Sequence, residues 1–367
     1  MPDARALFLF SSNIRPLYEQ DNLNVLAAPT GLLYRFRYHR EYLGPGLAEA
    51  WDSLVGRTCI AHFSLQQPRQ YHDAVIFPLR SGTVTRATRE AGDVFLLEFS
   101  VGGAVSLKEP APSTVNDPAA GARAYKDRVD QYRDYLTGHD VKLPYEAWAS
   151  LGPDITKDDA APVDVCADEG VMFERSTRYL AGTSSYQNAV FYRLLRLERR
   201  DGDKSREVPF TPNVGYRLVT SKAYHLVFLQ CQPHDVTSAR TFSATVDETI
   251  GRVVGLQGFE VASRYDVTSV PIIAAELSEA RAREGVLEIA PEGTFQGPIL
   301  TVPLRVEPEA LKTTGAVMAS IVGLVLVGLA SLLSSLSWPA AVGSLALGTV
   351  LATLVPLAMT GRTPWSG

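Results

Sequence analysis

The chain has 367 residues, of which 46% are hydrophobic, and its 35 Lys and Arg against 40 Asp and Glu give a formal net charge of −5. This hydrophobic content excludes a disordered or collagen-like chain, and the lack of basic excess argues against nucleic acid as a partner. The charge is unevenly spread, because residues 313–361, a run of 49, contain no Asp, Glu, Lys, Arg or His. The composition therefore predicts a mildly acidic body followed by an uncharged, apolar end.

Residues 1–108 are expected to form an N-terminal β-rich domain. Short runs with the composition of strands occur at residues 6–12, 22–28, 32–43, 57–65, 73–80 and 93–101, and one helix is expected at residues 44–56. This pattern predicts a small β-barrel or a curled sheet with a helix across it.

Residues 109–162 are predicted to be a linker that contains an amphipathic helix. Tyr125, Val129, Tyr132 and Leu136 follow one another at the spacing of a single helix face. Residues 163–310 then hold many short strand-like runs about 8–12 residues apart, which is typical of an antiparallel β-sandwich. Because the last of these runs ends close to the apolar end, we expect this sandwich-like domain to lie next to the membrane.

The apolar end predicts a C-terminal transmembrane α-hairpin. Residues 316–336 and 339–360 would each reach roughly 30 Å as a helix, which matches the hydrocarbon core of a bilayer. Small residues recur in them at four-residue spacing, which suits close packing of helices within one hairpin or between copies in a homo-oligomer. These residues are Ala319, Gly323, Ser344, Gly348 and Ala352.

The flanks of the apolar run indicate the orientation. Lys312 and Arg362 bracket it, and the positive-inside rule places such charges in the cytoplasm. The first residues do not have the pattern of a signal peptide. We therefore expect an integral membrane protein with its body and both termini in the cytoplasm, at the inner membrane if the source is bacterial, and with the lipid bilayer as a partner.

A basic strand is one candidate ligand site. Arg35, Arg37 and His39 alternate with aromatic residues in the run 32–43, so the three basic side chains share one face of a strand. Such a face could bind a phosphate or another anion. The alternative is that the aromatic face lies in the core and the charged face is simply solvated.

Two Cys-x-x-His pairs form a candidate metal site. Cys59 with His62 and Cys231 with His234 would supply the four ligands of a tetrahedral zinc. Residues i and i+3 of a strand point to opposite faces, however, which argues against a shared metal. With three cysteines in all, we expect a reducing compartment without disulfides and no cofactor.

No sequence motif of a known catalytic or nucleotide-binding site stands out. The chain has no G-x-S-x-G, H-E-x-x-H, Walker A or G-x-G-x-x-G motif, so we lean against an enzyme. The leading hypothesis is a non-enzymatic, membrane-anchored cytoplasmic sensor, effector or signalling protein with protein partners. The alternative is a constitutive scaffold or assembly subunit of a membrane-associated complex, and an enzyme acting at the membrane surface ranks third.

Overall fold

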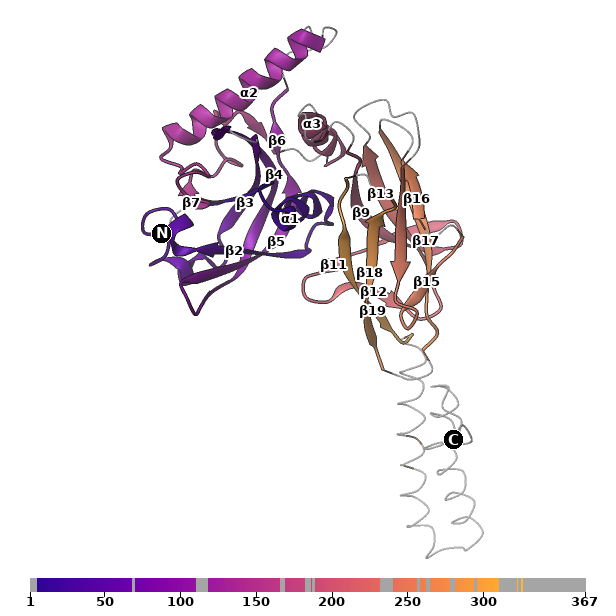
Figure 1. Ribbon diagram of the computed structural model, residues 1–367. Coiled ribbons are helices and arrows are strands. Elements are labelled where there is room, and N and C mark those ends of the chain that lie inside the picture. The colour runs from indigo at the N-terminus through magenta and orange to yellow at the C-terminus, as the bar shows by residue number, and fades with distance from the viewer. Residues whose placement is uncertain are drawn as a thin grey trace, which may run out of the picture.

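The chain folds mainly into β-sheets, with a curled sheet and few helices (Figure 1). The computed structural model describes residues 5–67, 70–109, 118–165, 169–181, 186, 189–231, 240–255, 258–261, 265–277, 281–293, 296–309, 322 and 325.

A six-stranded sheet builds the N-terminal half. Its strand order is β2-β5-β4-β3-β1-β7. The bounds are β1 (Ala6–Ser12), β2 (Leu33–His39), β3 (Thr58–Gln67), β4 (Gln70–Glu90), β5 (Val94–Ala104) and β7 (Ala149–Gly152). Strands β1 and β3 pair in parallel, and the other neighbours are antiparallel.

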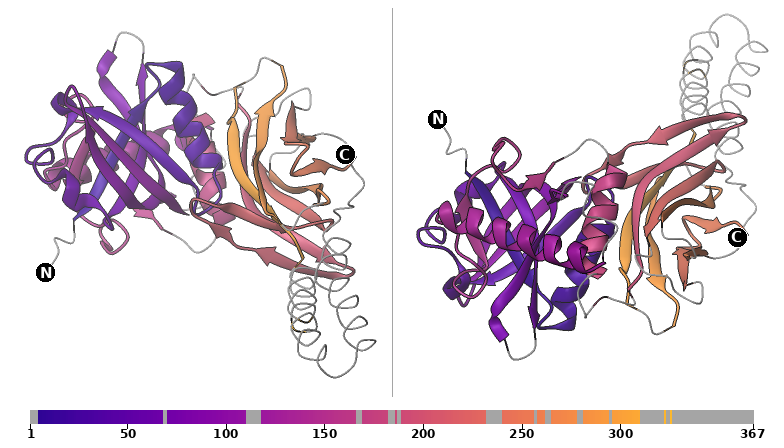
Figure 2. Two further views of the ribbon diagram at one scale, coloured as in Figure 1. Left: turned by 90° about the horizontal axis from the view of Figure 1, so that it is seen from below. Right: turned by 90° about the horizontal axis from the view of Figure 1, so that it is seen from above.

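The two edges of this sheet meet, so the sheet curls around an interior. The Trp148 N–H donates to the Tyr42 carbonyl and the Gly44 N–H to the Ala149 carbonyl, both at 2.7 Å, and Leu43 forms a parallel bridge with Ala149. The segment after β2 thereby reaches β7 at the far edge. The expected curled sheet is confirmed (Figure 2).

Two local predictions in this half are wrong. Residues 22–28 belong largely to helix α1 (Pro16–Ala27), where Pro16 occupies the first turn, a position that suits proline. The helix expected at 44–56 is only the short 3₁₀ turn η2 (Trp51–Leu54), which follows another, η1 (Arg40–Tyr42). Gly46 and Gly56 have positive φ angles of 73° and 82°, which a continuous right-handed helix does not allow.

Helix α2 (Pro118–Gly138) lies across one face of the curled sheet (Figure 1). Its residues Val129, Tyr132 and Leu136 are buried. They pack in the same hydrophobic cluster as Phe8 and Phe10 of β1. The short strands β6 (Ser106–Leu107) and β8 (Val163–Asp164) pair nearby.

Two further sheets build the second half, and they face each other (Figures 1 and 2). One has the order β10-β9-β13-β17-β15 and the other β11-β12-β19-β18-β14-β16. Their pairings are antiparallel except for β12 with β19, which run in parallel. The strands are β9 (Phe191–Asp201), β10 (Lys204–Val208), β11 (Phe210–Thr211), β12 (Gly215–Val219), β13 (Ala223–Cys231), β14 (Arg240–Val246), β15 (Gly251–Val253), β16 (Gly258–Val261), β17 (Tyr265–Ala274), β18 (Arg283–Pro291) and β19 (Leu300–Glu307).

The halves share a continuous hydrophobic core, which one cluster of buried side chains extends across. Helix α1 also holds them together through polar contacts. The Ile299 N–H donates to Asn24 Oδ1 at 2.8 Å, and the Tyr186 hydroxyl donates to Glu19 Oε1 at 2.6 Å. Helix α3 (Glu169–Ala181) lies between the halves (Figure 1).

No helix among the described residues is long and apolar enough to cross a membrane. The two segments predicted to cross, 316–336 and 339–360, lie outside the described residues apart from residues 322 and 325. The small residues Ala319, Gly323, Ser344, Gly348 and Ala352 lie outside them too.

Candidate ligand-binding site

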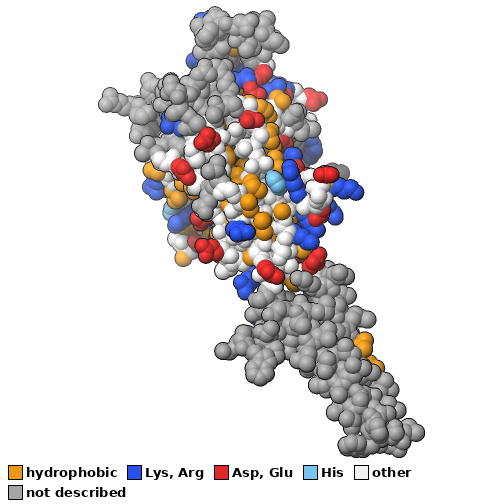
Figure 3. Space-filling model, turned by 90° about the vertical axis from the view of Figure 1, so that its right-hand side faces the viewer, with side chains coloured by type: hydrophobic (Ala, Val, Ile, Leu, Met, Phe, Trp, Pro, Cys, Tyr) orange, Lys and Arg blue, Asp and Glu red, His pale blue; other side chains and the backbone are white. Residues whose placement is uncertain are grey.

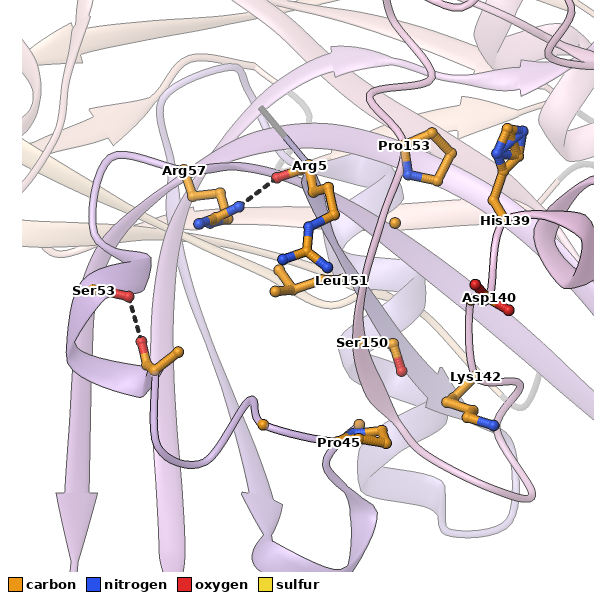
Figure 4. A pocket seen from close by; sticks show the side chains of 14 residues that line it. Arg5, Pro45, Ser53, Arg57, His139, Asp140, Lys142, Ser150, Leu151 and Pro153 are labelled. Carbon is orange, nitrogen blue, oxygen red and sulfur yellow. Dashed lines mark hydrogen bonds between the residues drawn. The ribbon is translucent and has the colours of Figure 1, made fainter. Parts of the chain in front are cut away.

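A cavity of about 920 Å³ opens at the end of the curled sheet where β1 and β3 begin (Figure 4). Four separate parts of the chain line it: the start of β1, residues 44–57, the loop after α2, and β7 with the residues after it. Its volume lies within the range of pockets that hold small molecules. We call it the N-terminal cavity.

Two arginines form one side of the N-terminal cavity. Arg5 directly precedes β1, and Arg57 directly precedes β3. Because these strands run in parallel, with Leu7 opposite Cys59, the residues before them meet at one edge of the sheet. One guanidinium nitrogen of Arg57, Nη1, donates to the Arg5 carbonyl at 2.7 Å. The parallel pairing therefore places two cationic side chains side by side on the cavity wall (Figure 4).

Ser150 of β7 contributes a buried hydroxyl to the wall. Its side chain is only 2% exposed, and its Oγ has no hydrogen-bond partner. A Cβ atom on Gly44 would lie 2.9 Å from this Oγ, so a larger residue there would crowd it. A buried hydroxyl without a partner costs free energy.

The loop after α2 forms the third side. Asp140, with a φ angle of 60°, and Lys142 both line the cavity. Lys142 is half-exposed and lies 3.3 Å from Glu146. His139 also lines it, and its Nε2 lies 3.8 Å from Asp158 Oδ2, an oxygen that also accepts from the Tyr135 hydroxyl. The Asp158 carboxylate therefore holds His139 at the rim.

The charges of the lining favour an anion. Arg5, Arg57 and Lys142 are cations, the last of them paired with Glu146, and Asp140 is the one carboxylate among the described lining residues. Arginine forms bidentate hydrogen bonds with carboxylate and phosphate groups. The cavity can therefore hold a small molecule with a negatively charged group next to the two arginines and a hydrogen-bond donor near Asp140.

The basic strand that the sequence suggests as a ligand site lies on an open surface. In β2 the side chains of Arg35, Arg37 and His39 are exposed, whereas Phe36 and Tyr38 are buried. Arg35 Nη2 lies 3.2 Å from Glu98 Oε2 on the neighbouring β5. This arrangement matches the alternative of an aromatic core face and a solvated charged face, and none of the three residues lines the N-terminal cavity.

The first Cys-x-x-His pair is divided between two sides of β3. Cys59 packs in the cluster shared by both halves, and burial raises the pKa of its thiol. His62 instead contacts the rings of Phe10 and Tyr132. Its Nδ1 donates to the Ile60 carbonyl at 3.0 Å, and its Nε2 accepts from the Tyr132 hydroxyl at 2.6 Å. Both ring nitrogens of His62 therefore have partners other than a metal.

The second pair is only partly described. Cys231 is buried at the end of β13, and burial raises its pKa to about 11, whereas His234 lies outside the described residues. Among the residues that the structure does describe, no three His, Cys, Asp or Glu side chains come together as a metal site.

Sequence reasoning missed Arg5, Arg57 and Ser150 as site residues. Each is unremarkable in its own stretch of sequence, and the parallel pairing of β1 with β3 brings the two arginines together. An arginine immediately before each of two strand-like runs, RALFLF and RTCIAHF, is the one signal that the sequence carries.

Comparisons with known proteins add little. No family model matches the chain, and no curated protein matches it. Among solved structures, a Bacteroides ovatus GH5 xyloglucanase in complex with a XXXG heptasaccharide is similar over 25% of this chain and 17% of its own, with 8% identity and a TM-score of 0.18. A likeness of this size carries no argument about fold or function.

Proposed function

We propose that this chain is a non-enzymatic, membrane-anchored cytoplasmic sensor or signalling protein that binds a small anionic ligand in the N-terminal cavity. The observation that carries the proposal is the cavity itself, whose lining includes Arg5, Arg57 and Lys142. In this proposal the curled sheet acts as a small β-barrel that receives the ligand. The second half acts as a β-sandwich next to the membrane.

The anchoring part of the proposal rests on the sequence. The 49 residues without charge follow soon after β19, which ends at Glu307. Two apolar segments of this length suit a transmembrane hairpin. The row of small residues would let the hairpins of several copies associate in the bilayer. In this proposal, ligand binding in the N-terminal half changes that association.

Among the described residues that line the cavity, Ser150 has no base beside it, which supports the non-enzymatic interpretation. A serine nucleophile needs a base within hydrogen-bond reach, and no described residue is hydrogen-bonded to Ser150 Oγ. His139 is instead paired with Asp158. The cavity is therefore better suited to binding than to acyl transfer.

A cavity-filling variant tests the proposal. Ser53 is exposed at the cavity wall, so Ser53→Trp would fill space without removing a charge. The full chain is purified in detergent, and its thermal unfolding is followed with a panel of anionic metabolites. We expect at least one of them to raise the Tm of the parent chain and leave that of Ser53→Trp unchanged.

Thr245 is exposed on β14, in the other half, and Thr245→Trp is the matched control that should keep the response. An equal response of all three proteins would contradict the proposed site. Extraction of the full chain from membranes by high salt alone would contradict the proposed anchor.

One observation favours the alternative of a scaffold. The outer face of the five-stranded sheet has hydrophobic side chains along β17, among them the exposed Val267 and the half-buried Pro271 and Ile273. Figure 3 shows a band of hydrophobic side chains on this side of the molecule. Exposed apolar surface of this kind often marks a protein contact. A scaffold would bind its partner equally well in the parent chain and in Ser53→Trp.

A further inference from the structure

We propose that, outside a membrane, the first apolar segment, residues 316–336, packs as a helix against the outer face of the five-stranded sheet of the second half. The inference goes beyond the proposed function, because it concerns the chain before it enters a bilayer and does not depend on a ligand. It commits the exposed apolar face along β17 to one occupant, which is a segment of this same chain.

The outer face carries a continuous strip without charge. The residues of β17 that alternate with the buried Val270 and Ile272 point outward. They are Val267, Ser269, Pro271 and Ile273. On β13, Ala223 lies opposite Ile273 and His225 opposite Pro271, so both belong to the same face. Burial lowers the pKa of His225, so this outer strip is uncharged at neutral pH (Figure 3).

A helix already covers the other end of the same face. The next outward residues of β13, Leu229 and Cys231, are buried in one hydrophobic cluster with side chains of α3. The Cys231 thiol also has a hydrogen bond with the side chain of Thr177 on α3. Leu229 lies opposite the exposed Val267. The outer strip therefore continues the surface on which α3 packs, and a second helix would complete that layer.

The apolar segment follows the body at the open end of the outer strip. Lys222 Nζ lies 3.4 Å from Glu309 Oε1. Lys222 directly precedes Ala223, and its carbonyl accepts from the N–H of the residue after Ile273 at 3.0 Å. Because the six residues 310–315 reach at most about 20 Å, the apolar segment begins within reach of the strip.

The segment has an apolar stripe of its own. Val322 and Val325 are helical and exposed, and residues three apart lie on one side of a helix. A helix of residues 316–336 is about 30 Å long, and the strip from Val267 to Ile273 is about 20 Å long. In water, these two exposed apolar surfaces are stabilised by packing on each other. In a bilayer, lipid replaces the sheet as the cover of the helix.

Cross-linking of the full chain tests the contact. The chain is synthesised without lipid or detergent, and a short bis-maleimide joins Ser269→Cys on the strip to Val322→Cys on the segment. We expect this pair to cross-link within one chain at least about tenfold faster than Thr245→Cys with Val322→Cys, because docking raises the effective concentration of the two thiols. Thr245 is exposed on the other sheet. Each single-cysteine variant controls for the three cysteines of the parent chain.

A charge on the strip gives a second test. Val267 is 53% exposed, so Val267→Asp should keep the Tm of the full chain in detergent, where detergent covers the segment. Without detergent or lipid, we expect Val267→Asp to lose most of its soluble fraction on sedimentation, because docking would bury the new charge. Thr245→Asp is the matched control that should stay soluble.

The outcomes separate this inference from the proposed function. Equal cross-linking of the two cysteine pairs, equal solubility of the two aspartate variants, or aggregation of the parent chain without lipid would overturn it. Cross-links that join only different copies would make a second copy the occupant of the strip, which also overturns it. Vesicles of phosphatidylcholine and phosphatidylglycerol should abolish the cross-link within the chain. If that link persists in vesicles, the docking is supported and the proposed anchor is wrong.

Discussion

The N-terminal half buries titratable side chains, whereas the space between the two sheets of the second half is aromatic. His62 lies between β3 and α2, against Tyr132, and Arg80 lies on β4, and both are fully buried. The buried arginine of the second half, Arg193, pairs with Glu169 of α3. The interior between the two sheets of the second half is filled by aromatic rings in mutual contact, which are Tyr192, Phe228, Phe242 and Phe259. An apolar core is tolerant of small shifts, whereas buried polar groups need each partner in place. The buried polar groups of the N-terminal half therefore depend more strongly on the exact position of their partners than does the aromatic space between the two sheets of the second half.

Arg80 shows how such a group is accommodated. Its Nε and Nη2 donate to the Gly102 carbonyl, its Nη1 donates to the Ala28 carbonyl at 3.0 Å, and its Nη2 reaches Thr30 Oγ1 at 3.3 Å. Ala28 follows the last residue of α1, where a positive charge is favourable because the carbonyls of a helix end are unsatisfied. Burial lowers the pKa of Arg80 to about 9, so the group remains charged at neutral pH. It fastens α1 to the sheet.

Removal of this arginine should have the largest effect. Arg80→Ala leaves several carbonyl groups buried without a donor and opens a cavity, so we expect it to lower the free energy of unfolding by about 3–5 kcal/mol. Arg86 lies on the same strand but is exposed, and Arg86→Ala should change stability by less than about 0.5 kcal/mol. Denaturant unfolding of the full chain in detergent measures both. Equal effects of the two variants would mean that the buried arginine contributes no more to the free energy of unfolding than the exposed one.

Acid should destabilise the N-terminal half through His62. Burial lowers the pKa of this imidazole to about 3, below the usual 6.5 of the unfolded chain. The neutral ring is therefore favoured in the folded state, and its contribution is full above pH 6.5 and is lost as the pH falls toward 3. The loss should reach about 2 kcal/mol by pH 5.

The comparison with His62→Gln isolates this effect. Glutamine can still form hydrogen bonds but does not titrate, so the variant should lose less stability than the parent between pH 7 and pH 5. Asp21, whose pKa burial raises to about 6, acts with the opposite sign in both proteins, because its protonation favours the folded state as the pH falls. Parallel curves of stability against pH for parent and variant would show that protonation of His62 does not cause the loss of stability in acid.

The sequence predicts the local pattern of the fold well. The alternation in β2 correctly places Phe36 inside and Arg35 outside, because the period of a strand is set by local geometry. Helix α1 was not predictable in this way, since the residues 22–27 at its end are compatible with either a helix or a strand. There tertiary packing decides, as it often does for short apolar runs.

The cavity was beyond what the sequence could predict for a physical reason. Arg5 and Arg57 are 52 positions apart, and their meeting depends on the parallel register of β1 with β3. Likewise, the pairing of Arg35 with Glu98 depends on β2 lying beside β5. Spacing along the chain reveals which residues share a face, but not which strands are neighbours.

The smallest effect is expected in the aromatic interior of the second half. Phe228 contacts the rings of Tyr192 and Phe259, at centroid distances of 5.9 and 4.7 Å. Phe228→Leu keeps the site apolar but removes the ring contacts, so we expect a loss of about 1–1.5 kcal/mol. The difference in stability between parent and variant should be the same at pH 7 and pH 5.

The shape of the unfolding curve gives this variant a second use. Because one cluster of buried side chains runs through both halves, we expect a single transition that Phe228→Leu moves as a whole, whether it is followed by tryptophan fluorescence or by circular dichroism. The second half contains no tryptophan, because Trp51 and Trp148 lie in the N-terminal half and Trp338 and Trp365 come after β19. Tryptophan fluorescence therefore does not report on the half that the substitution changes. A fluorescence midpoint that stays fixed while the circular-dichroism midpoint falls would mean that the halves unfold separately. The second half would then not contribute to the stability of the N-terminal half.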